Sequence, residues 1–246
     1  MAKVLIATEK PFAAAAVEGI KNIISDAGFE IAVLEKYTEK KQLLEAVADA
    51  DALIVRSDKV TAEVIAAAPK LKIVVRAGAG FDNIDLEACT ERGIVAMNTP
   101  GQNSNAVAEL ALAMMIFMSR NQFTPGTGME IKGKKLGIQA YGNVGRLVAE
   151  KAKGLGMDVM AFDPFVPAEK MVEEGVTPAE TLEQMYEQCN FVSLHIPAIP
   201  ATIGSINYNL ISRMPKGGCV VNTARKEVIN EPAVSYTHLT LPTSDL

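Results

Sequence analysis

Short apolar segments rich in β-branched residues recur along the chain of 246 residues, and helix-like segments separate them. Each is nearly continuously apolar, as is typical of strands in parallel sheets that helices cover on both faces. The pattern predicts an α/β fold with right-handed crossover connections. The predicted strands lie at residues 3–8, 30–36, 52–57, 72–78, 94–98, 135–140, 157–163, 190–197 and 219–225.

The alternation of strands and helices breaks between residues 97 and 134. Asn103 or Ser104 can cap a helix that runs to about residue 120. Because this helix is apolar nearly all round, we expect it to be buried between domains or against another subunit. A loop rich in glycine follows it. So many strands exceed what one sheet would comfortably hold, and we therefore expect two doubly wound parallel-sheet domains, at residues 1–98 and 99–233.

Composition and charge exclude several classes of function. The net charge of −5 and the absence of a Lys/Arg run argue against nucleic acid or an anionic membrane as a partner. The most apolar stretch, residues 106–118, is too short to span a bilayer. The cysteines Cys89, Cys189 and Cys219 form no CxxC pair, which suits buried thiols in a reducing compartment. We expect a soluble cytoplasmic protein without a metal site.

Residues 134–150, KKLGIQAYGNVGRLVAE, combine a strand, a glycine-containing turn and a helix. This order fits the dinucleotide fingerprint G-x-G-x-x-G, with Ala140 in the first position. Gly142 would let the backbone approach a pyrophosphate, and Gly145 would allow close helix–strand packing. The N-terminus of the helix would offer unpaired N–H groups to the phosphates. An ordinary strand–helix turn explains a degenerate glycine motif about equally well.

The acidic residue that ends the next predicted strand favours the dinucleotide interpretation. Asp163 closes the segment MDVMAFD, 21 residues after Gly142, where an acidic residue should bind the ribose hydroxyls. Its negative charge would also repel a 2′-phosphate. The succession of strand, turn, helix, strand and acid therefore predicts a dinucleotide site, with NAD favoured over NADP as the cofactor.

Several motifs resemble those of the D-isomer-specific 2-hydroxyacid dehydrogenase family. Besides the fingerprint they are VRS, RAGAGFDNIDLEA, NTPGQNSNAVAEL, SLHIP and VNTARKEVINE, at residues 55–57, 76–88, 98–110, 193–197 and 221–231. The resemblance implies a flavodoxin-like substrate domain, a Rossmann NAD domain and hydride transfer at C2 of a 2-hydroxy acid. NTPGQNSNAVAE and RAGAGFDN point within the family to oxidation of 3-phospho-D-glycerate to 3-phosphohydroxypyruvate, the first step of serine biosynthesis.

The fingerprint departs from the family at one position. Ala140 stands where the family usually has glycine. Because alanine asks for an ordinary backbone conformation, we expect one here. The substitution weakens the motif without excluding the nucleotide.

The resemblance also implies roles for individual residues. Arg225 matches the family's catalytic arginine, whose planar fork would hold the substrate carboxylate. Without the match, a cap on the strand end or a pair with Glu227 would be the simpler explanation. Arg56 would bind the substrate phosphate, although a solvated residue is the alternative. The other expected substrate contacts are Ser57, Gly78 and Asn103. The expected cofactor contacts are Ala79, Gly142, Asn143, Val144, Gly145, Asp163, His195, Ile196, Pro197, Thr223 and Ala224.

His195 and His238 are the two histidines and therefore candidates for the general acid/base. The resemblance places His195 beside the cofactor, because the family's acid/base histidine comes much later in the chain. Residues 234–246 lack periodicity, and VSYTHLTLPT can be reverse-translated into a transposon end and adaptor used for sequencing libraries. We interpret them as a non-native tail. The general acid/base would then be missing, and we expect a truncated second domain, weak NAD binding and little turnover.

Two other functions stay open. A reductase acting on glyoxylate or hydroxypyruvate would share the fold and most of the motifs. A non-enzymatic, NAD-sensing protein of the corepressor type would bind the nucleotide and dimerise without dehydrogenase activity. The expected partners are a small-molecule substrate, with 3-phosphoglycerate the first candidate, and a second copy of the chain bound through the helix at residues 104–119.

Overall fold

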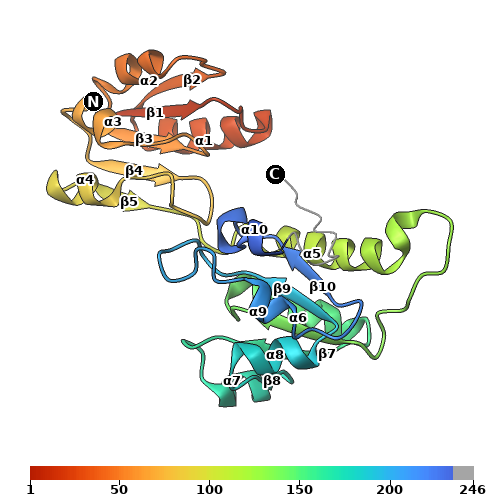
Figure 1. Cartoon of the computed structure of the whole chain (residues 1–246). Coiled ribbons are helices and arrows are strands. Elements are labelled where there is room, and N and C mark those ends of the chain that lie inside the picture. The colour runs from red at the N-terminus through yellow and green to blue at the C-terminus, as the bar shows by residue number, and fades with distance from the viewer. Residues whose placement is uncertain (235–246) are drawn as a thin grey trace. The chain divides into compact units, whose positions relative to one another are not determined.

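The computed structural model describes residues 1–234, so His238 and most of the expected tail lie outside the described part. The chain divides into two compact units, Met1–Gln102 and Asn103–Leu246. Figure 1 shows a separate sheet in each unit. The boundary lies four residues after the predicted one, and the assignment of one unit to substrate and the other to nucleotide stays a prediction.

The first unit alternates strands and helices throughout. Its five strands are all parallel, in the order β2-β1-β3-β4-β5. This is the flavodoxin-like doubly wound order. The predicted α/β class and parallel sheet are confirmed. The elements are β1 (Lys3–Thr8), α1 (Ala14–Asp26), β2 (Glu30–Glu35), α2 (Lys40–Val47), β3 (Ala52–Val55), α3 (Ala62–Ala66), β4 (Ile73–Arg76), α4 (Leu86–Glu91) and β5 (Val95–Met97).

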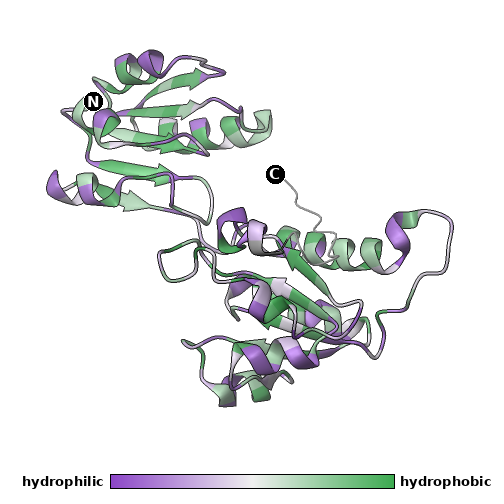
Figure 2. Cartoon of the chain, viewed as in Figure 1, coloured by the Kyte–Doolittle hydropathy of each residue, from purple (hydrophilic) through white to green (hydrophobic). Residues whose placement is uncertain are grey.

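Both faces of the first sheet carry apolar side chains, because successive residues of a strand point to opposite faces. Along β1, Leu5 and Ala7 join the larger hydrophobic cluster, which includes residues of α2, α3 and α4. Val4 and Ile6 join the smaller cluster, which includes Ile24 of α1. Figure 2 shows the strands as mainly hydrophobic and parts of the helices as hydrophilic. The nearly continuous apolar runs of the sequence therefore reflect burial on both sides.

The second unit has its own parallel sheet, in the order β10-β9-β6-β7-β8. If β6 is counted as strand 1 of this sheet and β10 as strand 5, the order read from the β8 edge is 3-2-1-4-5. This is the Rossmann order. The predicted Rossmann class is confirmed. The elements are α5 (Ser104–Ser119), η1 (Asn121–Phe123), β6 (Lys135–Gln139), α6 (Asn143–Gly154), β7 (Asp158–Phe162), α7 (Ala168–Glu173), β8 (Thr177–Pro178), α8 (Leu182–Gln188), β9 (Phe191–Leu194), α9 (Tyr208–Ile211), β10 (Cys219–Asn222), η2 (Lys226–Val228) and α10 (Glu231–Val234).

Strand β8 was not predicted from the sequence. It has two residues, one of them a proline, and pairs only with β7 at the edge of the sheet. Proline lacks the N–H group that a central strand must donate, but an edge strand tolerates it. So short a strand leaves no apolar run to detect.

The apolar helix α5 buries one face inside its own unit. Ala108, Ala111, Leu112 and Met115 belong to a hydrophobic cluster with residues of α6, β6 and β10. At its start, Asn103 occupies the N-cap position, but its side chain makes no capping hydrogen bond. The expected burial of the rest of the helix against another domain or subunit stays a prediction.

Candidate nucleotide and substrate sites

Most of the predicted cofactor residues lie at the carboxyl edge of the second sheet. In doubly wound sheets, ligands bind outside the carboxyl ends of the strands where the strand order reverses. Here the reversal lies between β6 and β9. Gly142 follows β6, Asp163 follows β7, His195 follows β9 and Thr223 follows β10. The fold therefore brings residues far apart in sequence to one edge.

The turn between β6 and α6 has a left-handed backbone at Ala140, with φ of 76°. The prediction of an ordinary conformation at this position is wrong. A residue with a β-carbon pays roughly 1–2 kcal/mol for this conformation. The backbone of Ala140 makes two tertiary contacts. The Ala140 N–H donates to the Phe162 carbonyl at 3.0 Å, and the Ala140 carbonyl oxygen lies against Gly145. The turn at Ala140 therefore has a left-handed backbone that glycine would adopt without strain.

The two glycines of the fingerprint are needed for different reasons. A β-carbon on Gly145 would overlap the Ala140 carbonyl oxygen and come within 3.1 Å of Ile138 Cγ2, so close packing excludes a side chain. A β-carbon on Gly142 would meet no atom of the described chain within 4 Å. Gly142 is exposed, at the N-cap of α6, with φ of −87°. Neither packing nor backbone strain explains this glycine, whereas close approach of a phosphate to the helix N-terminus would.

Asp163 is fixed beside this turn by two backbone donors. Its Oδ2 accepts the Tyr141 N–H at 2.8 Å, and its Oδ1 accepts the Phe165 N–H at 2.9 Å. An ionised carboxylate has about four acceptor positions, so capacity remains for ligand hydroxyls. Asp163 also borders a cavity of about 340 Å³ with mainly apolar walls. The cavity is lined by Phe162, Asp163, Pro164, Val166, Ala168, Met171, Pro178, Ala179 and Glu180.

His195 connects the ends of three strands. Its backbone N–H donates to the Gln139 carbonyl at 3.0 Å. Its Nε2 lies 2.9 Å from Ser193 Oγ, and its Nδ1 lies 3.4 Å from Thr223 Oγ1. Burial of the imidazole lowers the pKa of His195 to about 4. The ring is therefore neutral near pH 7, which suits a structural and cofactor-lining role better than that of a general acid/base.

This low pKa predicts a pH-dependent stability. The folded pKa lies below the ordinary value, so the unfolded chain binds the proton first and stability falls as the pH drops from 6.5 toward 4. We expect the free energy of unfolding of the second unit to decrease by about 2 kcal/mol between roughly pH 7.5 and pH 5 through His195. Urea unfolding of wild type and His195→Gln at both pH values measures this contribution. An equal pH dependence in the two proteins would contradict it.

A side chain that the sequence analysis missed closes the turn carrying Arg225. Asn222, at the end of β10, accepts the Ala224 N–H at its Oδ1 and donates from Nδ2 to the Arg225 carbonyl, both at 2.9 Å. The hydrogen bond from the Ala224 N–H to Asn222 Oδ1 makes an Asx turn, a turn that asparagine favours. The position of Asn222 directly after an apolar strand could have indicated this turn. Thr223, Ala224 and Arg225 are partly exposed.

The remaining cofactor candidates lie on the same edge. Asn143 is the exposed first residue of α6, and Val144 packs partly against the core. After β9, Ile196 is buried and Pro197 is exposed. All the predicted cofactor residues of the second unit therefore follow or begin elements at the carboxyl edge, while Ala79 lies in the first unit.

Four predicted residues lie together at the carboxyl edge of the first sheet. Arg56 and Ser57 are exposed after β3, and Gly78 and Ala79 follow β4. Arg76 joins the two loops, because its Nε donates to the Arg56 carbonyl at 3.0 Å. A β-carbon on Gly78 would overlap the Arg76 guanidinium, so a side chain there would require the flexible end of Arg76 to move.

The fourth substrate candidate, Asn103, belongs to the other unit. Asn103 begins the second unit and is exposed. The described contacts within the first unit therefore do not bring it together with Arg56, Ser57 and Gly78.

The first unit contains a second residue that sequence reasoning missed. Asp58 is 4% exposed, and its Oδ1 accepts the Tyr37 hydroxyl at 2.6 Å and the Glu9 N–H at 2.7 Å. Its carbonyl accepts from Asn83 Nδ2 at 2.8 Å. Asp58 thus joins the loops that follow β1, β2, β3 and β4, directly beside Arg56 and Ser57. Nothing in the periodicity distinguishes it from a solvated loop carboxylate.

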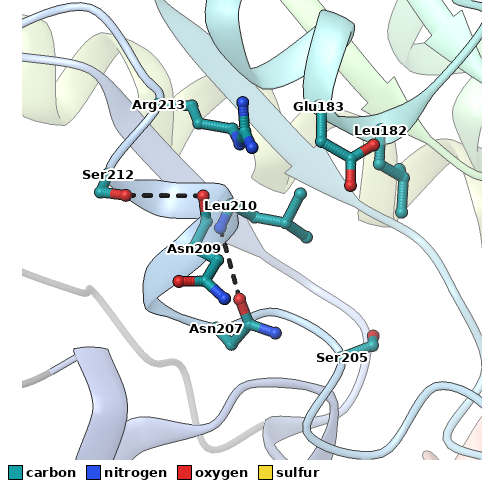
Figure 3. Close-up of a pocket in the computed structure, with 8 residues that line it drawn as sticks. All are labelled: Leu182, Glu183, Ser205, Asn207, Asn209, Leu210, Ser212 and Arg213. Atoms are coloured by element: carbon teal, nitrogen blue, oxygen red, sulfur yellow. Dashed lines mark hydrogen bonds between the residues drawn. The ribbon is translucent and has the colours of Figure 1, made fainter.

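A larger cavity of about 550 Å³ lies between α8 and α9 and contains none of the predicted site residues (Figure 3). Several of its polar groups are engaged locally. Asn207 Oδ1 accepts the Leu210 N–H at 3.3 Å, and Arg213 pairs with Glu187 at 2.5 Å. Leu182, Glu183, Ser205, Asn207, Asn209, Leu210, Ser212 and Arg213 line it.

The described part of the chain offers neither a metal site nor a membrane span. No group of three or more His, Cys, Asp or Glu side chains there is arranged to hold a metal ion. Within residues 1–234, no helix combines the length and apolarity needed to cross a membrane. The three cysteines are free, with Cys89 and Cys189 buried and Cys219 partly buried.

Comparison with known proteins gives the family. Residues 5–240 match the model of the D-isomer specific 2-hydroxyacid dehydrogenase catalytic domain. D-3-phosphoglycerate dehydrogenase of Methanocaldococcus jannaschii is 37% identical, over 87% of this chain and 46% of that protein. Hydroxypyruvate reductase of Thermotoga maritima is also 37% identical, over 83% and 70%.

A solved structure is more similar still. NAD⁺-bound 3-phosphoglycerate dehydrogenase of Entamoeba histolytica has a TM-score of 0.92 and 46% identity, covering 99% of this chain and 82% of that one. The chain spans about half the length of the curated phosphoglycerate dehydrogenases that it matches. On its family match and on this likeness, the chain belongs to the D-isomer-specific 2-hydroxyacid dehydrogenase family.

Proposed function

We propose that this protein is an NAD-dependent oxidoreductase that oxidises 3-phospho-D-glycerate to 3-phosphohydroxypyruvate. The observation that carries the proposal is Gly142, an exposed glycine at the N-terminus of α6 that no atom of the described chain requires. Asp163, fixed beside it, supplies an acceptor for ribose hydroxyls. The similar Entamoeba histolytica protein is a 3-phosphoglycerate dehydrogenase solved with NAD⁺, which supports the same cofactor and substrate here.

The proposed roles follow from charge and position. The N–H groups at the start of α6 would hold the pyrophosphate, and Asp163 the ribose. Bound NAD⁺ would accept the hydride from C2 of the substrate, and the C2 hydroxyl proton would pass to a general base, a role that we assign to no residue among 1–234. Arg225 would hold the substrate carboxylate with its planar guanidinium. Arg56 and Ser57, exposed after β3, would contact the substrate phosphate.

Cofactor choice offers a direct test. Because the Asp163 carboxylate would repel a 2′-phosphate, we expect the chain to bind NADH at least about tenfold more tightly than NADPH, a difference of about 1.4 kcal/mol. Isothermal titration with both nucleotides measures the ratio. Asp163→Asn should reduce it, whereas Asp158→Asn, at the opposite end of β7, should not. Equal affinity of wild type for both nucleotides would refute the assignment.

A reductase acting on hydroxypyruvate is the second candidate. It is favoured by the Thermotoga maritima relative, of which this chain covers 70%. The two candidates differ in the substrate phosphate, so Arg56→Ala should weaken binding of 3-phosphoglycerate about tenfold and leave hydroxypyruvate unaffected. Titration of both compounds into the NADH-saturated protein separates the two readings. An equal loss for both compounds would speak against a phosphate contact.

We also propose that a second copy of the chain binds through α5 and that the protein is cytoplasmic. The helix is largely apolar, yet Ala113 is exposed and Met114, Phe117 and Met118 are only partly buried in the described residues. Sedimentation equilibrium tests the proposed dimer, since a monomer at micromolar concentration would contradict it.

The proposed cytoplasmic location rests on the cysteines, because their free thiols suit a reducing compartment.

A further inference from the structure

Tyr141, the residue between Ala140 and Gly142, is held between two carboxylates. It is 2% exposed. Its N–H donates to Asp163 Oδ2 at 2.8 Å, and its hydroxyl donates to Glu174 Oε2, also at 2.8 Å. Both hydrogen bonds are charge-assisted and therefore stronger than neutral ones. The Tyr141 N–H thus connects the fingerprint turn to Asp163 after β7, and the Tyr141 hydroxyl connects it to Glu174 at the end of α7.

Glu174 makes a second contact that closes the arrangement. Its Oε1 pairs with the Arg146 guanidinium, and Arg146 Cζ lies 4.7 Å from the centroid of the Tyr141 ring. Arg146 is in the first turn of α6, and Glu174 is the C-cap of α7. Lys153 Nζ also donates to the Glu174 carbonyl. Tyr141, Arg146 and Glu174 therefore form a three-membered cluster, which we call the turn clamp.

The turn clamp is unlike an ordinary surface ion pair. The side chains of Arg146 and Glu174 are 28% and 35% exposed, whereas those of Arg213 and Glu187 are 43% and 52% exposed. Exposed pairs contribute little because water screens them. In the turn clamp, a buried phenol and a stacked guanidinium share one carboxylate, and such networks hold their members in one geometry.

The position of the turn clamp gives it a function. The hydrogen bonds of the turn clamp hold Tyr141, the residue directly after Ala140. Ala140 has a left-handed backbone, which is unfavourable for any residue with a β-carbon. We propose that Tyr141, Arg146 and Glu174 hold Ala140 in this conformation and thereby keep the N-terminus of α6 open for the nucleotide phosphates. They are positioning residues, and the inference rests on the proposed nucleotide site. Without them, the fraction of chains with a competent turn would fall, and the apparent affinity with it.

A double-mutant cycle tests the proposal, because glycine at position 140 would adopt the left-handed conformation without strain. We expect Tyr141→Phe to weaken NADH binding about tenfold in the wild-type background. In the Ala140→Gly background, the same change should weaken it less than about threefold. Equal losses in both backgrounds, or no loss in the first, would overturn the proposal.

A matched pair of variants separates positioning from general stability. Glu174→Gln and Glu187→Gln each remove one negative charge from a carboxylate paired with arginine in the second unit. Only Glu174→Gln should weaken NADH binding, by about tenfold. Equal weakening by both, with equal shifts of the thermal midpoint, would mean that the turn clamp acts on stability alone.

Failure of the proposed function can be told apart from failure of this inference. If wild type binds no NADH, the proposed nucleotide site fails, but the turn clamp still predicts the hydrogen-exchange rates of the hydrogen-bonded amides of Ala140, Tyr141 and Arg146. Tyr141→Phe should raise those exchange rates at least about tenfold when residue 140 is alanine. It should raise them much less in the Ala140→Gly background. Unchanged exchange in the Ala140 background would refute the turn clamp by itself.

Discussion

Replacing Gly145 with alanine is expected to destabilise the second unit by about 3 kcal/mol or more, the upper range for overpacking. The new β-carbon would overlap the Ala140 carbonyl oxygen and lie 3.1 Å from Ile138 Cγ2. The carbonyl cannot move freely, because the Ala140 N–H is bonded to Phe162 across the sheet. Urea unfolding followed by circular dichroism measures the loss.

Gly142→Ala is the matched control for this experiment. It adds the same methyl group three residues earlier, where no atom of the described chain lies within 4 Å. We expect it to change the free energy of unfolding by about 1 kcal/mol or less, the usual scale of an N-cap substitution. It should instead weaken NADH binding at least tenfold. Comparable destabilisation by the two variants would contradict the different reasons assigned to the two glycines.

Asp58→Ala should have the second large effect, a loss of about 3 kcal/mol in the first unit, since each buried donor left without an acceptor costs about 1–3 kcal/mol. The change removes the acceptor of the Tyr37 hydroxyl and of the Glu9 N–H. Because Asp58 adjoins Arg56 and Ser57, binding of 3-phosphoglycerate should fall as well. Urea unfolding and substrate titration measure the two losses.

Asp58→Asn is the control for charge, because its amide oxygen can still accept from both donors. Within the described chain Asp58 Oδ2 is buried and makes no hydrogen bond, so replacing it with an amide nitrogen breaks none but buries two N–H donors. We expect the asparagine variant to be destabilised less than the alanine variant, because the Tyr37 hydroxyl and the Glu9 N–H keep their acceptor. NADH binding, assigned to the second unit, should survive in both variants. A parallel loss of NADH binding in Asp58→Ala would contradict that assignment.

Much of the fold could be predicted because burial leaves a local trace in the sequence. Every predicted apolar run contains a strand, and Asp163 stands at the end of β7 as expected. The doubly wound order of both sheets was implied by the family resemblance and is confirmed. β8 escaped notice because two residues, one of them a proline, produce no periodicity.

The candidate site was predictable only in part. The alternation of strands and helices determined that residues after β6, β7, β9 and β10 share an edge, because the carboxyl ends of parallel strands do so in every doubly wound sheet. It gave no hint of Asp58, whose importance lies in hydrogen bonds and not in a burial pattern, whereas the turn preference of asparagine could have indicated Asn222.

The sequence by itself therefore determined the α/β class, the strands and the position of the fingerprint. Only the tertiary structure decided the backbone at Ala140, the neutral state of His195 and the turn clamp. Tyr141 and Glu174 are 33 residues apart, and Thr223 and His195 are 28 apart. Hydropathy along the chain records how deeply each residue is buried. It does not record which distant side chain lies beside it, and that depends on the order of strands in the sheet.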